Sequence, residues 1–165
     1  MLHIHPKQAL LELVKRHPRL SSAQLAAILG CSAEEVDADL QELEEKKVIL
    51  KYHTFVDWEK AGVHNVTACI EVRLTPQREV GFDGIAENIY RYPEVCAMYL
   101  MSGSFDLMVF VEGRTLKEVA DFVATKLSTI EGVMGTSTNF MLKKYKEAGI
   151  VLEDDEEDRR LAVTP

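Results

Sequence analysis

The chain has 165 residues, of which 47% are hydrophobic and 28% charged, as in a globular protein with one medium domain or two small ones. No apolar run approaches the roughly 18 residues that cross a bilayer, and residues 1–6 lack the basic-then-apolar order of a secretory signal. Cys31, Cys69 and Cys96 have no C-x-x-C spacing. We therefore expect a cytoplasmic protein with free thiols, no metal site and no cofactor.

Charge is spread unevenly along the chain. The formal net charge is −8, residues 1–55 carry seven Lys/Arg against eight Asp/Glu, and residues 153–165 carry two against six. We interpret residues 151–165 as a solvated acidic tail. No segment is strongly basic, which argues against tight DNA binding by a single copy of the chain.

The first third of the chain has the pattern of three helices. Residues 7–16 carry an apolar stripe. A second helix is predicted after Ser21, which has capping-box spacing to Gln24, and a third after Ser32, which has the same spacing to Glu35. Two helices joined by a turn that contains Gly30 are typical of a helix-turn-helix. A bare three-helix bundle without a role in nucleic-acid binding remains the alternative.

Residues 48–58 are rich in β-branched and aromatic side chains and predict an extended connecting strand. We place the domain limits accordingly. The expected parts are a winged helix-turn-helix domain over 1–50, a linker strand over 51–62, a ligand-sensing and oligomerisation domain over 63–150, and the acidic tail.

The second domain has the element order of a ferredoxin-like β-α-β-β-α-β fold, which makes the whole chain α+β. Strands are predicted at 66–74, 95–101, 105–112 and 133–143, and helices at 82–92 and 115–130. Helices on one face of such a sheet leave the other face uncovered. Cys69, Met98 and Phe110 are the apolar candidates for that open face, and we expect homo-oligomerisation, as a dimer or higher, through it.

Four segments carry a resemblance to a known family: LAAILGCS (25–32), LEEKKVI (43–49), SGSFDL (102–107) and KLSTIEGV (126–133). The chain resembles regulators of the leucine-responsive regulatory protein/AsnC (Lrp/AsnC) family over residues 7–145. The resemblance implies a DNA-binding transcriptional regulator whose C-terminal domain senses a small effector, commonly an amino acid, and assembles into dimers or larger oligomers.

The resemblance also implies an effector site at the turn between the second and third strands of the C-terminal domain. Carried over to this chain, the site residues are Gly103, Phe105, Asp106, Leu107, Thr136 and Thr138. Glycine lets backbone amides approach a carboxylate, Asp106 can accept from an ammonium group, and threonine hydroxyls can complete the set. The alternatives are that Asp106 only caps its own turn and that both threonines are ordinary strand residues.

The third helix departs from the family pattern. Family members usually carry arginines at the positions of Ala38 and Asp39, whereas residues 33–47 here hold seven acidic side chains and only Lys46 and Lys47 as bases. Acidic groups turned toward phosphates oppose binding. The expected DNA contacts therefore come from other cations: Lys7, Lys15, Arg16, Arg19 and Lys51.

Two other functions remain as alternatives. A family member with weak or no DNA binding could sense a ligand and modulate a partner protein, which the acidic third helix favours. A haem-pathway decarboxylase of similar architecture would need polar groups such as histidines in the C-terminal domain, and no histidine follows His64. We therefore expect a protein that is not an enzyme.

Overall fold

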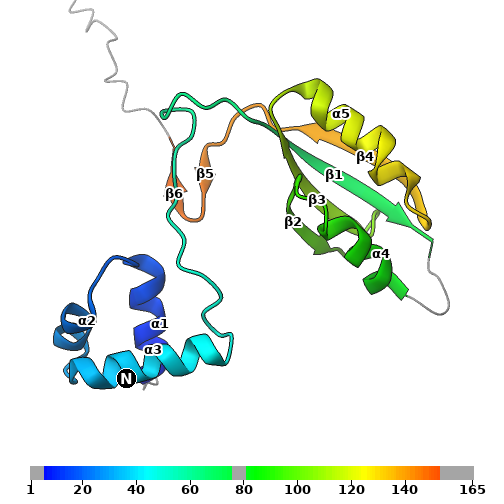
Figure 1. The fold of residues 1–165 in the computed structure, drawn as a ribbon. Helices are drawn as coiled ribbons and strands as arrows, with labels where there is room; N and C mark the ends of the chain where they lie inside the picture. The colour runs from blue at the N-terminus through cyan, green and yellow to red at the C-terminus, as the bar shows by residue number, and fades with distance from the viewer. Residues whose placement is uncertain (1–5, 76–80, 153–165) are drawn as a thin grey trace, which may run out of the picture. The chain divides into compact units, whose positions relative to one another are not determined.

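The computed structural model describes residues 6–75 and 81–152. The chain divides into two compact units, Met1–Val56 and Asp57–Pro165, and each is described by itself (Figure 1). Most of the expected acidic tail, from residue 153 onward, lies outside the described residues.

The N-terminal unit consists of the three predicted helices, α1 (Pro6–Arg16), α2 (Ser22–Leu29) and α3 (Ala33–Glu45). Both predicted capping boxes are confirmed, with Ser21 capping α2 and Ser32 capping α3. Gly30 ends α2 at φ +73°, in the left-handed region that glycine adopts without steric cost. These signals explain why the turn between α2 and α3 is short and sharply defined.

A small apolar core holds these helices together. Leu10 and Val14 of α1, Leu25 of α2, and Val36 and Leu43 of α3 are all buried. Each such side chain contributes roughly 1.5–3 kcal/mol when fully removed from water. The core therefore fixes which side of α3 faces inward.

The strand predicted at 48–58 is not formed. Residues 50–57 contain no helix or strand, and residues 58–62 form turns. A strand requires a neighbouring strand to satisfy its N–H and C=O groups, and no described strand pairs with this segment. Several of its β-branched and aromatic side chains, among them Tyr52, Val56 and Trp58, are exposed instead.

The C-terminal unit has the predicted ferredoxin-like fold. Its elements are β1 (Val66–Leu74), α4 (Gly81–Tyr90), β2 (Val95–Leu100), β3 (Leu107–Gly113), α5 (Leu116–Thr125), the 3₁₀ turn η1 (Leu127–Thr129) and β4 (Val133–Phe140). The sheet has the order β2-β3-β1-β4, and neighbouring strands are antiparallel. The helix predicted at 115–130 is shorter than expected, because α5 ends at Thr125 and the 3₁₀ turn η1 follows it.

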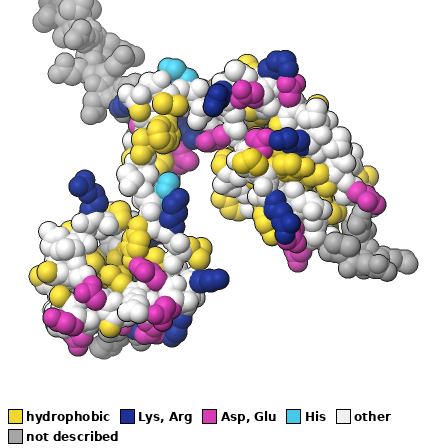
Figure 2. All heavy atoms as spheres, viewed as in Figure 1, with side chains coloured by type: hydrophobic (Ala, Val, Ile, Leu, Met, Phe, Trp, Pro, Cys, Tyr) yellow, Lys and Arg dark blue, Asp and Glu magenta, His cyan; other side chains and the backbone are white. Residues whose placement is uncertain are grey.

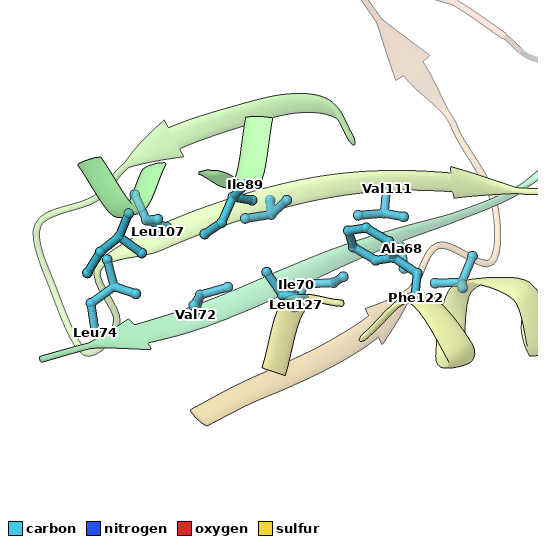
Figure 3. Close-up of a cluster of buried hydrophobic side chains, with 12 residues drawn as sticks. Ala68, Ile70, Val72, Leu74, Ile89, Leu107, Val111, Phe122 and Leu127 are labelled. Carbon is cyan, nitrogen blue, oxygen red and sulfur yellow. The ribbon is translucent and has the colours of Figure 1, made fainter. Parts of the chain in front are cut away.

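The core lies between the two helices and one face of the sheet. Alternate residues of β1 and β3, such as Ile70, Val72 and Val111, point to this face, and Ile89 of α4 and Phe122 of α5 pack onto them (Figure 3). All are buried. This alternation is the pattern expected of a sheet covered on one side, which leaves the opposite side as the open face.

Met98 does not lie on the open face, so this prediction was wrong. The pairing of β2 with β3 is irregular between Val95 and Ala97, and a bulged residue shifts all later side chains to the other face. Met98 pairs with Val109 and packs against the core, whereas Tyr99 pairs with Met108 on the open face. Tyr99 is 56% exposed.

A small hairpin follows the sheet. The predicted last strand ends at Phe140 rather than residue 143, and β5 (Lys146–Glu147) then pairs with β6 (Ile150–Val151). Its turn residues, Ala148 and Gly149, both have positive φ. Among the described residues, no helix has the length and apolar character to span a bilayer.

Candidate functional site

The turn between β2 and β3 is fixed to β1 by backbone groups and by one side chain. Asp106 N–H donates to the Val72 carbonyl (3.0 Å), and Met101 N–H donates to the Asp106 carbonyl (2.8 Å). The Asp106 carboxylate also accepts from Leu74 N–H at 2.7 Å, where the pairing of β1 with β4 is irregular. Asp106 therefore holds the turn in place through the backbone of a neighbouring strand.

A pocket of about 250 Å³ lies beside this turn, and we call it the sheet-end pocket. It is lined by Glu71, Arg73, Ser104, Phe105 and Ser137. Glu71 lies directly opposite Ser137 in the sheet register, and both belong to the open face. A guanidinium, a carboxylate and two hydroxyls at one small pocket can bind a molecule that carries both a negative and a positive group.

The six residues expected at the effector site do not all meet at this pocket. Phe105 lines it, and Gly103 and Asp106 belong to the adjoining turn. Leu107 is buried in the core with 1% of its surface exposed. Thr136 and Thr138 pair with Val72 and Ile70 and so share the helix-covered face of the sheet.

Four pocket residues were not predicted from the sequence: Glu71, Arg73, Ser104 and Ser137. The alternation of β1 does place Glu71 and Arg73 on the side opposite Ile70 and Val72. What the sequence lacks is the pairing register, since that decides which β4 side chain faces which β1 side chain. That register puts Ser137, rather than either threonine, beside Glu71.

The centre of the open face is apolar. Cys69 of β1 pairs with Phe110 of β3, and the Tyr99 ring packs edge-on against Phe110 with 6.2 Å between ring centroids. Burial, followed by the charge of Glu71, raises the pKa of the Cys69 thiol. These residues and Met108 form an apolar strip on the face of the sheet opposite to α4 and α5.

In the N-terminal unit, Lys7 is bound to the third helix. Its ammonium lies 3.0 Å from Asp39 Oδ1 and also donates to Glu42. Hydrogen bonds to Glu42 and then Asp39 raise the pKa of Lys7. Hydrogen bonds from Lys46 and then Lys7 lower the pKa of Glu42 to about 2. Lys7, expected to contact DNA, thus joins α1 to α3 in this structure.

Most other acidic side chains of α3 also have partners within the unit. Glu35 completes the cap of the helix, Asp37 accepts from the Ser22 hydroxyl of α2, and Glu45 accepts from the Gln41 amide at 2.9 Å. Glu44 accepts from the Tyr52 hydroxyl at 2.7 Å, and desolvation together with this bond raises the pKa of Tyr52 to about 12. Figure 2 shows acidic and basic groups interspersed on this unit.

The remaining expected DNA contacts are all exposed: Lys15, Arg16, Arg19 and Lys51. Lys15 and Arg16 form the last turn of α1, where Arg16 approaches Glu12 at 3.8 Å. Lys15, Arg19 and Lys51 have no acidic partner among the described residues. Lys47, which follows α3, is a further exposed cation of this kind.

Comparisons with known proteins agree with both units. The family model of the Lrp/AsnC ligand binding domain matches residues 67–151, and that of the DeoR-like helix-turn-helix domain matches residues 7–59. The HTH-type transcriptional regulator YugG of Bacillus subtilis is 44% identical over 157 residues, covering 94% of this chain and 95% of YugG. The proline dehydrogenase transcriptional activator of Rhizobium radiobacter is 26% identical, covering 86% and 90% of the two chains.

Solved structures share the fold at low sequence identity. The transcriptional regulator NMB0573 of Neisseria meningitidis, in complex with L-Met, has a TM-score of 0.73 at 19% identity, with 90% of this chain and 96% of that chain covered. AsnC of E. coli has a TM-score of 0.71 at 19% identity, with 91% and 99% covered. On these matches, the chain is a transcriptional regulator with a helix-turn-helix and a ligand-binding domain, and it belongs to the Lrp/AsnC family.

Proposed function

We propose that the protein binds DNA through its N-terminal unit and responds to a small α-amino acid that binds at the sheet-end pocket. The observation that carries this proposal is that Arg73, Glu71 and two serine hydroxyls line one pocket of a ligand-binding domain. The neighbour NMB0573 forms a complex with L-Met, which supports an amino acid as the class of effector.

The pocket chemistry suits the two ends of an amino acid. The Arg73 guanidinium can bind the α-carboxylate in a two-pronged contact, and the Glu71 carboxylate can accept from the α-ammonium. Ser104 and Ser137 add hydroxyls that donate or accept. Phe105 supplies an apolar wall, so the effector side chain is expected to be small or apolar.

Assembly is the second part of the proposal. The apolar strip of Cys69, Tyr99, Met108 and Phe110 is the face against which a second copy packs, because a sheet with helices on one side leaves its other side to a partner. The strip and the sheet-end pocket share one face of the sheet. An effector in the pocket therefore has a direct route to alter how two copies pack.

DNA binding is the third part, with phosphate contacts from Lys15, Arg16, Arg19 and Lys51. The alternative of a regulator that does not bind DNA was based on the acidic α3. Six of the seven acidic side chains in that helix have partners within the unit. These contacts explain the acidic residues by the packing of the unit, so they no longer favour a protein that does not bind DNA.

Calorimetry with each common amino acid tests the effector site. We expect one or a few to bind the unchanged protein, and Arg73→Gln to weaken binding by about 1.5–3 kcal/mol, the range for losing a hydrogen bond to a charged group. Arg114→Gln is the matched control, since Arg114 is exposed and follows β3 at the end away from the turn. Equal binding by Arg73→Gln and the control would show that the effector lies elsewhere.

The same preparations test DNA binding. Fluorescence anisotropy with labelled upstream DNA, with and without the bound amino acid, should give an affinity that changes with effector. An affinity for DNA that is the same with and without the amino acid would show that ligand binding does not regulate DNA binding. Absence of DNA binding in every condition would instead support the partner-modulating alternative.

A further inference from the structure

One line of α3 faces away from the core of its unit. Val36, Leu40 and Leu43 turn inward, with Val36 and Leu43 buried and Leu40 half-buried. At 3.6 residues per turn, the opposite side of the helix carries Glu34, Ala38 and Gln41, spaced i, i+4, i+7. All three are exposed, and we call them the outward strip.

Glu34 differs from the other acidic residues of α3. Among the described residues, no side chain or backbone group pairs with its carboxylate, whereas each of the other six has a partner. Its position in the first turn favours the helix dipole, but that effect leaves both carboxylate oxygens free to accept.

Gln41 keeps part of its bonding capacity. Its amide nitrogen donates to Glu45, which leaves the carbonyl oxygen and one N–H available. Ala38 presents only a methyl group. The outward strip therefore offers an acceptor, a methyl and an amide in sequence, and none of the three carries a positive charge.

We propose that the outward strip reads base edges in the major groove, a proposal that rests on the proposed DNA binding. Base readers of the helix-turn-helix type place the N-terminal part of the second helix of the motif against base edges. A glutamate accepts from the amino group of cytosine, a small apolar group contacts the methyl of thymine, and a glutamine bonds adenine. The strip thus selects cytosine at Glu34, thymine at Ala38 and adenine at Gln41.

The spacing agrees with a compact target. Seven residues of helix rise about 10 Å, and base pairs stack 3.4 Å apart, so the three contacts fall within about four consecutive base pairs. A carboxylate also rejects guanine O6 and thymine O4, because two acceptors face each other. Specificity therefore comes from the strip, while the cations at 15–19 and Lys51 supply affinity through phosphates.

Selection of bound duplexes from a random library, with the full-length protein, tests this reading. The unchanged protein is expected to enrich a motif that contains cytosine, thymine and adenine within four base pairs. Glu34→Gln should lower the preference for that cytosine about fivefold or more and favour adenine there, and Gln41→Ala should relax the adenine position. Glu12→Gln makes the same charge change on α1 and should leave every preference unchanged.

The outcomes separate this proposal from the broader one. If Glu34→Gln and Gln41→Ala select the same motif as strongly as the unchanged protein, DNA binding is supported, but the outward strip does not read the bases. An A·T pair at the position whose preference Glu34→Gln alters would overturn it as well. If the unchanged protein retains no duplex, the proposed DNA binding fails and this reading fails with it. Circular dichroism of each variant shows that the helices are intact.

Discussion

Lys7 of α1 lies 3.0 Å from Asp39 of α3, a position at which the family resemblance led us to expect arginine. An arginine at 39 would face Lys7 with a like charge, so the acid at this position belongs to the packing of α1 on α3. Glu42 binds the same lysine. Much of the acidic charge of α3 is therefore paired with groups of the same unit.

The ion pairs of Glu42 predict a specific loss of stability in acid. Its pKa is about 2 in the folded chain, against an ordinary value of 4.5. A carboxyl with a lowered folded pKa stabilises the fold above its ordinary value, and this contribution is lost as the pH falls from about 4.5 toward 2. Glu42→Gln should be less stable than the unchanged protein at neutral pH, and the difference should shrink in that window.

Thermal unfolding followed by circular dichroism between pH 2 and 7 measures this effect. Glu34→Gln is the control, because that carboxylate has no partner among the described residues. A pH profile of Glu42→Gln that parallels the unchanged protein throughout would show that the Lys7 and Lys46 pairs do not stabilise the fold.

Asp106 predicts a stability effect that does not depend on any ligand. Its carboxylate accepts from Leu74 N–H, so Asp106→Ala leaves that amide without a partner and should cost about 1–3 kcal/mol of unfolding free energy. Asp83→Ala, an exposed acid in the first turn of α4, should change it much less. Chemical denaturation without added amino acid measures both. Equal stability of the two variants would show that the bond from Leu74 N–H does not anchor the turn.

The open face predicts assembly. Phe110→Glu places a charge in the centre of the apolar strip and should convert an oligomer to a monomer, because an unpaired buried charge is costly at an interface. Leu116→Glu is the control on α5, where Leu116 is 58% exposed. Light scattering of the full chain at micromolar concentration gives the mass. A monomer before any substitution would refute packing through this face.

Most elements could be predicted from local sequence signals. The errors arise where the pairing of distant strands determines which face a residue lies on or how a turn is formed. The caps at Ser21 and Ser32 and the alternation of 66–74 locate their elements because a few neighbouring residues determine them. Met98 was assigned to the wrong face because one bulged residue on β2 reverses the alternation, and apolar residues on both faces gave no sign of it. The β5–β6 turn was missed because Ala148 takes a positive φ that its residue type does not favour.

The candidate site shows the same division. The effector role of the turn between β2 and β3 was an implication of the family resemblance, and of the six residues expected there only Phe105 lines the sheet-end pocket. The charged residues there, Glu71 and Arg73, come from β1, 30 and 28 positions before Met101, and Ser137 comes from β4. The order β2-β3-β1-β4 of the predicted fold brings these strands together. The register that places Ser137 opposite Glu71 cannot be obtained from composition or from spacing along the chain.

The last prediction separates the cations that contact DNA from those that hold the fold. Arg19 is exposed and has no acidic partner among the described residues, whereas Lys7 is engaged by Asp39 and Glu42. Each phosphate contact adds about 0.9 to the slope of log affinity against log salt concentration. Arg19→Ala should therefore weaken binding to all sequences alike and reduce the slope by about one per copy in contact. Lys7→Met should lower the melting temperature and leave the slope unchanged. Titrations of labelled upstream DNA at several salt concentrations measure both slopes, and a reduction for Lys7→Met equal to that for Arg19→Ala would mean that Lys7 leaves its acidic partners to bind phosphate.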